Sequence, residues 1–119
     1  MCKGKIHRAT VTEADLSYMG SITIDAALMA AADILPYEIV QITSFRNATR
    51  WKTYALPGEA GSGTICLNGP PAHLFQPGDQ IIILSMASYT EEELRSLVSC
   101  VVFVDGNNQL LRVEKHAIK

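Results

Sequence analysis

Hydrophobic and polar residues alternate along most of this chain over stretches of four to ten residues, the pattern of half-buried β-strands. It predicts strands over residues 3–12, 21–24, 38–45, 50–56, 64–68, 80–88, 100–104 and 109–114. The unbroken apolar run Ile81–Leu84 indicates a strand buried on both faces. Turn sequences at Arg46–Thr49 and Asp105–Asn108 predict two hairpins. We therefore expect a compact β-barrel, whose closure would cover the edges of the 80–88 strand.

Two short helices are expected between these strands. Asp25 is a suitable N-cap for an alanine-rich helix that reaches Asp33 and ends before Pro36. The capping-box sequence Thr90–Glu93 predicts a second helix that continues to about Val98. Glycine and proline mark the remaining segments, a mobile loop and two turns, at 57–63, 69–71 and 77–79.

Composition narrows the class of protein. The 119 residues fit one domain, and 10 Lys+Arg against 12 Asp+Glu give a net charge of −2, which makes a nucleic-acid partner improbable. Hydrophobic residues make up 48% and charged residues 18%, so we expect a partner or further copies to cover part of the surface. We expect no membrane span and no secretory signal, because no apolar segment has the required length.

The cysteines and histidines do not form a recognisable metal motif. Cys2, Cys66 and Cys100 are widely spaced, which favours reduced thiols in a cytoplasmic protein, with Cys66 and Cys100 as small buried residues. The three histidines also lack ligand spacing, so we expect no metal. With so few ionisable groups, catalysis would need an electrophile other than an ordinary side chain.

The Gly20–Ser21 bond offers a route to such an electrophile. Glycine has no Cβ, so the Gly20 carbonyl is open to attack by the Ser21 hydroxyl. Attack converts the amide to an ester, and elimination then cuts the chain and leaves a group that hydrolyses to pyruvoyl. Most Gly-Ser pairs are simple turns, so this pair alone does not establish the reaction.

A wider set of motifs surrounds this bond. They are Gly4–Arg8, Ala14–Leu16, Tyr18–Asp25, Arg50–Ala55, Ile65–Gly69 and Gly78–Ile83. With these motifs, from Lys5 to about Val113, the chain resembles the bacterial pyruvoyl-dependent aspartate 1-decarboxylases, which make β-alanine for pantothenate and coenzyme A.

The resemblance implies a double-psi β-barrel with short helices and a homotetramer with active sites between subunits. It implies a single-domain precursor, residues 1–119, that is cleaved between Gly20 and Ser21 into chains 1–20 and 21–119. The Ser21-derived pyruvoyl group would form a Schiff base with L-aspartate and act as the electron sink for decarboxylation. Whether cleavage is spontaneous or needs a maturation helper protein stays open.

The resemblance also implies residue roles. For cleavage, Tyr18 lies beside the scissile bond and the Thr53 hydroxyl assists at the Gly20 carbonyl. For catalysis, Tyr54 donates the proton that replaces the lost carboxylate.

Substrate binding would use residues from several of the same motifs. Arg50 would grip a carboxylate, Lys5 would supply a second cation and His7 would shape the pocket, to which Thr53 also contributes. Asn68 and Gly69 would close that pocket. Without the resemblance, each of these residues would be an ordinary surface or strand residue.

Some alternatives remain. Pro70–Pro71 replaces the small residues that many family members carry after Asn68–Gly69, so no backbone N–H is available there. A non-catalytic β-barrel that serves as a binding or assembly module is the competing function. Lys5 and Arg50 favour a diacid but do not separate aspartate from glutamate.

Overall fold

The computed structural model describes residues 1–18 and 20–119, and it is built mainly of strands. The strands are β1 (Cys2–Thr10), β2 (Glu13–Asp15), β3 (Ser21–Asp25), β4 (Ile39–Ser44), β5 (Arg50–Gly58), β6 (Ile65–Asn68), β7 (Gln80–Met86), β8 (Val98–Val104) and β9 (Leu110–Ala117). The helices are α1 (Ala26–Ala31) and the 3₁₀ turns η1 (Pro70–His73) and η2 (Glu93–Arg95). No helix among the described residues is long and apolar enough to cross a membrane.

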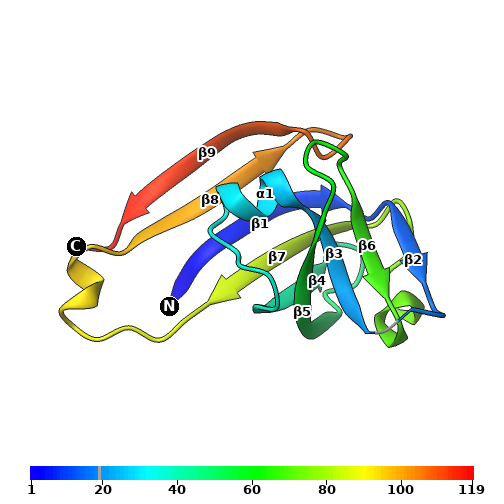
Figure 1. Cartoon of the computed structure of the whole chain (residues 1–119), viewed down its shortest axis with the longest axis horizontal. Coiled ribbons are helices and arrows are strands. Elements are labelled where there is room, and N and C mark those ends of the chain that lie inside the picture. The colour runs from blue at the N-terminus through cyan, green and yellow to red at the C-terminus, as the bar shows by residue number, and fades with distance from the viewer. Residues whose placement is uncertain (19) are drawn as a thin grey trace.

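The strands form one curved, mixed sheet in the order β2-β6-β3-β5-β4-β7-β1-β8-β9 (Figure 1). Alternate side chains of β1, β3, β4 and β7 point into a shared core, where Ile6, Ile22, Ile42 and Ile83 are fully buried. The mainly β class with short helices is confirmed, and the sheet is consistent with the expected small barrel. Strand β7 has a partner on each side, β4 and β1, so its edges are covered as predicted.

The strand pairings and the helix cap predicted from strong turn and capping sequences are confirmed. Strands β4 and β5 form one antiparallel hairpin, and β8 and β9 form the other. Helix α1 begins after Asp25, which caps it as expected. In β1 the register shifts between Ile6 and Ala9, where Arg8 has a φ of 59°. This bulge lets both Ile6 and Ala9 face the core although they are three residues apart.

Other predictions were wrong. The helix expected to reach Val98 is only the short turn η2, because Val98 already pairs with Ala117 in the β8–β9 ribbon. Strand β7 is buried on one face and half-buried on the other, so Ile82 and Leu84 are not fully enclosed. Cys66 is buried as predicted, but Cys100 is only half-buried, because its ribbon forms the outer end of the sheet.

Two further segments differ from expectation. Strand β2, where no strand was expected, pairs with β6 in parallel. The expected loop at 57–63 begins inside β5, which continues to Gly58.

The β8–β9 ribbon and the segment that leads into β8 form the end of the molecule that carries the C-terminus (Figure 1). Some of its apolar side chains face outward, with Leu110 49% and Leu111 61% exposed, whereas Val102 is fully buried in the core. The excess of apolar residues noted in the sequence is therefore partly on the surface.

Asp25 holds helix α1 and the 59–63 turn together from a buried position. Its carboxylate accepts hydrogen bonds from the N–H groups of Ala27 (2.8 Å), Gly61 (3.0 Å) and Gly63 (2.9 Å). Burial alone would raise the pKa of Asp25, but these backbone N–H groups outweigh it and hold the pKa below its ordinary value. The carboxylate thus stabilises the fold in its ionised form.

We predict that Asp25→Ala lowers the free energy of unfolding by about 2–4 kcal/mol, since it removes a cap and leaves buried N–H groups unpaired. Because the folded pKa is depressed, the stabilisation is complete above about pH 4 and is lost as the pH falls through the folded pKa. Urea unfolding between pH 2 and 7 measures this. Asp25→Asn should flatten that pH dependence, and an unchanged slope would contradict the assignment.

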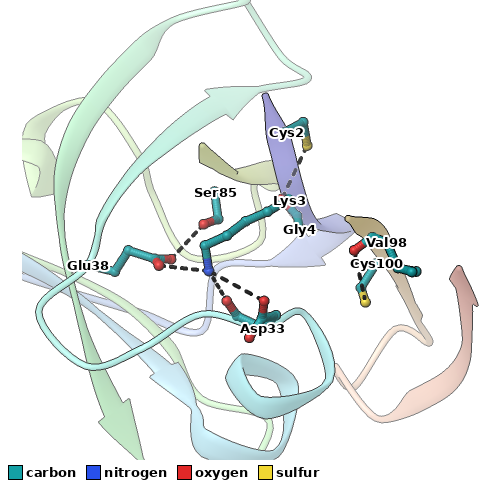
Figure 2. A network of polar contacts seen from close by, with 8 residues as sticks. All are labelled: Cys2, Lys3, Gly4, Asp33, Glu38, Ser85, Val98 and Cys100. Carbon is teal, nitrogen blue, oxygen red and sulfur yellow. Dashed lines mark hydrogen bonds and ion pairs between the residues drawn. The ribbon is translucent and has the colours of Figure 1, made fainter. Parts of the chain in front are cut away.

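A buried charged group ties β1 to the segment before β4. The Lys3 ammonium contacts the Glu38 carboxylate at 2.8 Å and donates to the Asp33 carbonyl (Figure 2). The Ser85 hydroxyl donates to the other oxygen of Glu38 at 2.6 Å. The Lys3 side chain is only 9% exposed, so water can barely solvate its ammonium group. The Glu38 carboxylate takes the place of that water.

Candidate functional site

The Gly20–Ser21 bond lies at the entry to β3, with β5 on one side and β6 on the other. On the β6 side, Ser21 is the direct partner of Asn68. On the β5 side, the parallel register pairs Ile22 with Ala55. If this register is extended by one and then two residues toward the start of both strands, Ser21 falls beside Tyr54 and Gly20 beside Thr53. The topology therefore places the predicted cleavage residues at the start of β3, at the end of β6 and in the middle of β5.

The Asn68 side chain holds the Ser21 hydroxyl. Its amide nitrogen donates to Ser21 Oγ and to Thr23 Oγ1, both at 3.0 Å. Its amide oxygen accepts from Cys66 Sγ at 3.2 Å. Ser21 is fully buried and Asn68 is 3% exposed, so these contacts are shielded from bulk water. The Asn68 amide thus holds the Ser21 hydroxyl in a defined position.

The backbone of Gly69 packs directly against that of Gly20. Gly69 has a φ of 76°, and a Cβ added there would lie 2.9 Å from both the Cα and the N of Gly20. A Cβ added at Gly20 would meet nothing closer than Pro70 Cδ at 3.6 Å. Packing therefore requires glycine at position 69, whereas glycine at position 20 is not demanded by space.

We predict that Gly69→Ala displaces the Gly20–Ser21 bond and slows chain cleavage at least tenfold, because the left-handed backbone and the contact with Gly20 both oppose a Cβ. Gel analysis of freshly made precursor measures the rate. Gly61→Ala is the matched control, since Gly61 also has a positive φ but its Cβ would meet nothing within 4 Å. Equal rates in the two variants would contradict the contact.

Pro70 and Pro71 open η1, directly after this glycine. Neither can donate a backbone hydrogen bond. The N–H groups on either side are occupied within the chain, because Gly69 donates to the Asp15 carbonyl at 2.7 Å and Ala72 donates to the Gly69 carbonyl at 3.0 Å. Side chains must therefore provide most of the polar contacts at this turn.

On β5, the functional candidates are divided between the two faces of the strand. Arg50 and Tyr54 lie at even spacing and share one face, about 13 Å apart along an extended strand. Thr53 lies between them in the sequence, faces the opposite side and is half-buried. The Tyr54 ring stacks on Tyr37, with the ring centroids 5.6 Å apart and the planes at 16°. This contact restricts the orientation of the Tyr54 ring.

The candidates on β1 lie away from this end of the sheet. Three strands, β5, β4 and β7, separate β1 from β3, so Lys5 and His7 are four strand spacings from Ser21. His7 packs edge-on against Phe45 and Phe103, with ring centroids 5.9 and 5.5 Å away. Burial, followed by the charges of Lys5 and Arg8, lowers the pKa of His7. The imidazole is therefore neutral at pH 7.

Only part of the predicted site lies close together in the fold. It brings together Gly20, Ser21, Asn68 and Gly69, and it places Arg50, Thr53 and Tyr54 on the neighbouring strand β5. Lys5 and His7 lie on β1, farther along the sheet. The Tyr18 side chain is 57% exposed, and its backbone carbonyl lies beside Gly69. Met19, within the predicted motif, lies outside the described residues. Among the described residues, no cluster of histidine, cysteine or carboxylate groups could hold a metal ion.

The sequence reasoning missed Cys66, Thr23 and Tyr37. Cys66 and Thr23 could have been found from strand alternation, since each is two residues from a predicted site residue and so shares its face. Tyr37 gave no signal, because its contact with Tyr54 joins two segments that are far apart in the sequence and Tyr37 has an unusual positive φ of 66°.

Comparison with known proteins completes the picture of this site. The family model described as aspartate decarboxylase matches residues 1–111. The aspartate 1-decarboxylases of Moorella thermoacetica and Pelotomaculum thermopropionicum are each 55% identical over 115 residues, covering 97% of this chain and 90% and 87% of theirs. That of Caldicellulosiruptor saccharolyticus is 52% identical over 118 residues, which cover 97% of this chain and 92% of the relative. With its Gly20–Ser21 bond held between β5 and β6, this chain belongs to the aspartate decarboxylase family.

Proposed function

We propose that this chain is the precursor of a pyruvoyl-dependent enzyme that converts L-aspartate to β-alanine and CO2. A single observation carries the proposal: Ser21, whose hydroxyl Asn68 holds at 3.0 Å, follows a glycine whose backbone is packed against Gly69. The relatives from Moorella and Pelotomaculum are named for the same reaction. We place the enzyme in the cytoplasm, where its product would serve pantothenate and coenzyme A synthesis.

The proposed chain cleavage uses only atoms of the Gly20–Ser21 segment and one water molecule. Ser21 Oγ adds to the Gly20 carbonyl carbon, the C–N bond breaks, and an ester forms as the Ser21 amine is released. Loss of the Ser21 α-proton breaks the Cβ–O bond, which frees the Gly20 carboxylate and leaves dehydroalanine. Water then replaces the nitrogen of that residue, releasing ammonia and leaving a pyruvoyl group. The products are chains 1–20 and 21–119.

The residues around Ser21 fit a pyruvoyl group. The Asn68 amide that donates to Ser21 Oγ can equally donate to a carbonyl oxygen on the same residue. Thr23 Oγ1, at 3.0 Å from that nitrogen, keeps the amide in place when the serine hydroxyl is gone. The bound group supplies an electron sink for the carbanion that loss of CO2 leaves behind.

The side chains of this chain then bind the substrate and deliver a proton. Tyr54 directly precedes Ala55, the register partner of Ile22, and is the proton donor that we propose, with its ring held by Tyr37. Arg50 supplies a guanidinium fork for a carboxylate on the same face of β5. Thr53, facing the other side, assists cleavage at the Gly20 carbonyl.

Lys5 and His7 reach this substrate in our proposal only from a second copy. They lie four strand spacings from Ser21 within one chain, on strand β1. The neutral imidazole of His7 suits a wall of the pocket, and Lys5 adds a cation for the second carboxylate. A homotetramer with sites between subunits meets this requirement and would also cover the exposed apolar side chains of the β8–β9 ribbon.

An assay for product tests the function. The protein incubated with aspartate should release β-alanine and CO2, and faster than it decarboxylates glutamate. Sodium borohydride added with aspartate should attach mass to the 21–119 chain and abolish activity. A protein that neither acts on aspartate nor reacts with borohydride would be the non-catalytic barrel instead. Comparing purified protein with cell extract would show whether cleavage needs a helper.

A further inference from the structure

Cys66 completes a buried chain of polar contacts that ends at Ser21. Cys66 and Asn68 are two residues apart on β6 and lie on the same face of the strand. The Cys66 thiol donates to the Asn68 amide oxygen at 3.2 Å, and the amide nitrogen donates to Ser21 Oγ at 3.0 Å. Cys66 is 7% exposed, so water does not replace this contact.

The thiol decides which way the Asn68 amide faces. A carboxamide can be turned by 180°, which exchanges its oxygen and its NH2 group. The hydroxyls of Ser21 and Thr23 can each donate or accept, so they favour neither orientation. A protonated thiol is a donor and only a poor acceptor, so it selects the amide oxygen. The two N–H hydrogens are thereby directed at the Ser21 and Thr23 oxygens.

The surroundings of Cys66 keep its thiol protonated. Burial raises the pKa of Cys66, and the carboxylates of Glu13 and Asp15 raise it further. Both acidic residues belong to β2, in which Glu13 is the register partner of Cys66. The thiol therefore remains a hydrogen-bond donor throughout the neutral pH range, and it is a poor nucleophile.

We propose that Cys66 is a positioning residue for chain cleavage: it orients the Asn68 amide, which in turn holds the Ser21 hydroxyl for attack on the Gly20 carbonyl. The inference rests on the proposed function, because it requires that Ser21 is the cleaving group. It adds a role for a thiol that takes no part in the bonds that form and break.

The test measures the first-order cleavage of precursor made in a cell-free system and followed by mass spectrometry. Cys66→Ala should slow cleavage about fivefold, the effect of losing one buried hydrogen bond. Cys66→Ser retains a hydrogen-bond donor at the same place, so this variant should cleave at a rate within about twofold of that of the unaltered chain. Cys100→Ala, the matched control at a half-buried cysteine, should cleave at the original rate.

Cys66→Ala cleaving at the original rate would overturn the inference, as would Cys66→Ser slowing as much as Cys66→Ala. Thermal unfolding of each variant in a Ser21→Ala background shows whether a rate change merely follows lost stability. If the unaltered chain and Cys100→Ala both stay intact even when cell extract is added to supply a helper protein, the proposed function itself is wrong. The two failures are therefore distinguishable in one experiment.

Discussion

Ser21→Ala should leave an uncleaved chain with no measurable decarboxylase activity. The substitution removes the hydroxyl that would attack the Gly20 carbonyl and the side chain from which the pyruvoyl group would form. Activity should fall by at least about 10⁴-fold, since without the electron sink the enzyme loses its main source of rate enhancement. The fold should persist, because Asn68 keeps its contact with Thr23. Gel analysis and a β-alanine assay measure both effects.

Ser17→Ala is the matched control for this variant. Ser17 lies four residues earlier and its hydroxyl donates to Asp15 at 2.8 Å in an exposed turn. Its replacement should leave both cleavage and activity intact. Decarboxylase activity retained by Ser21→Ala would exclude Ser21 as the source of the electrophile.

Lys3→Met should lower the free energy of unfolding by about 3 kcal/mol. The variant leaves the Glu38 carboxylate, 17% exposed, without its cationic partner. The Ser85 hydroxyl still donates to Glu38, so some of the charge remains stabilised. Urea unfolding at a fixed chain concentration measures the loss.

The double variant Lys3→Met, Glu38→Leu tests the cause of that loss. It removes both charges and places apolar groups where they meet, so it should recover a substantial part of the stability. Lys52→Met, at an exposed position of β5, should change stability by less than about 0.5 kcal/mol. If the double variant is less stable than Lys3→Met alone, the unpaired charge is not the reason.

Local sequence signals predicted the parts of this fold whose stability is local. The Asp25 cap and the Asp105–Asn108 turn gave the start of α1 and the β8–β9 hairpin, because each depends on contacts within a few residues. The bulge between Ile6 and Ala9 was hidden in an apparently irregular pattern. The helix expected after Thr90 failed because pairing with β9 stabilises Val98 more than one further helical turn would.

The candidate site was predictable to a similar extent. The residues around the scissile bond could be identified from motifs, and the register of β3 with β5 and β6 places them together. The separation of Lys5 from Ser21 depends on the order of five strands, which no local pattern encodes. The contact of Cys66 with Asn68 could be recognised only from the pairing of β6 with β3. From sequence alone, a buried cysteine is expected to act as a small apolar residue.

Mass spectrometry of the denatured protein tests the central claim most directly. We expect two chains, residues 1–20 and 21–119, with a pyruvoyl group at the start of the longer one. An intact chain of 119 residues in a preparation that converts aspartate to β-alanine would contradict the account.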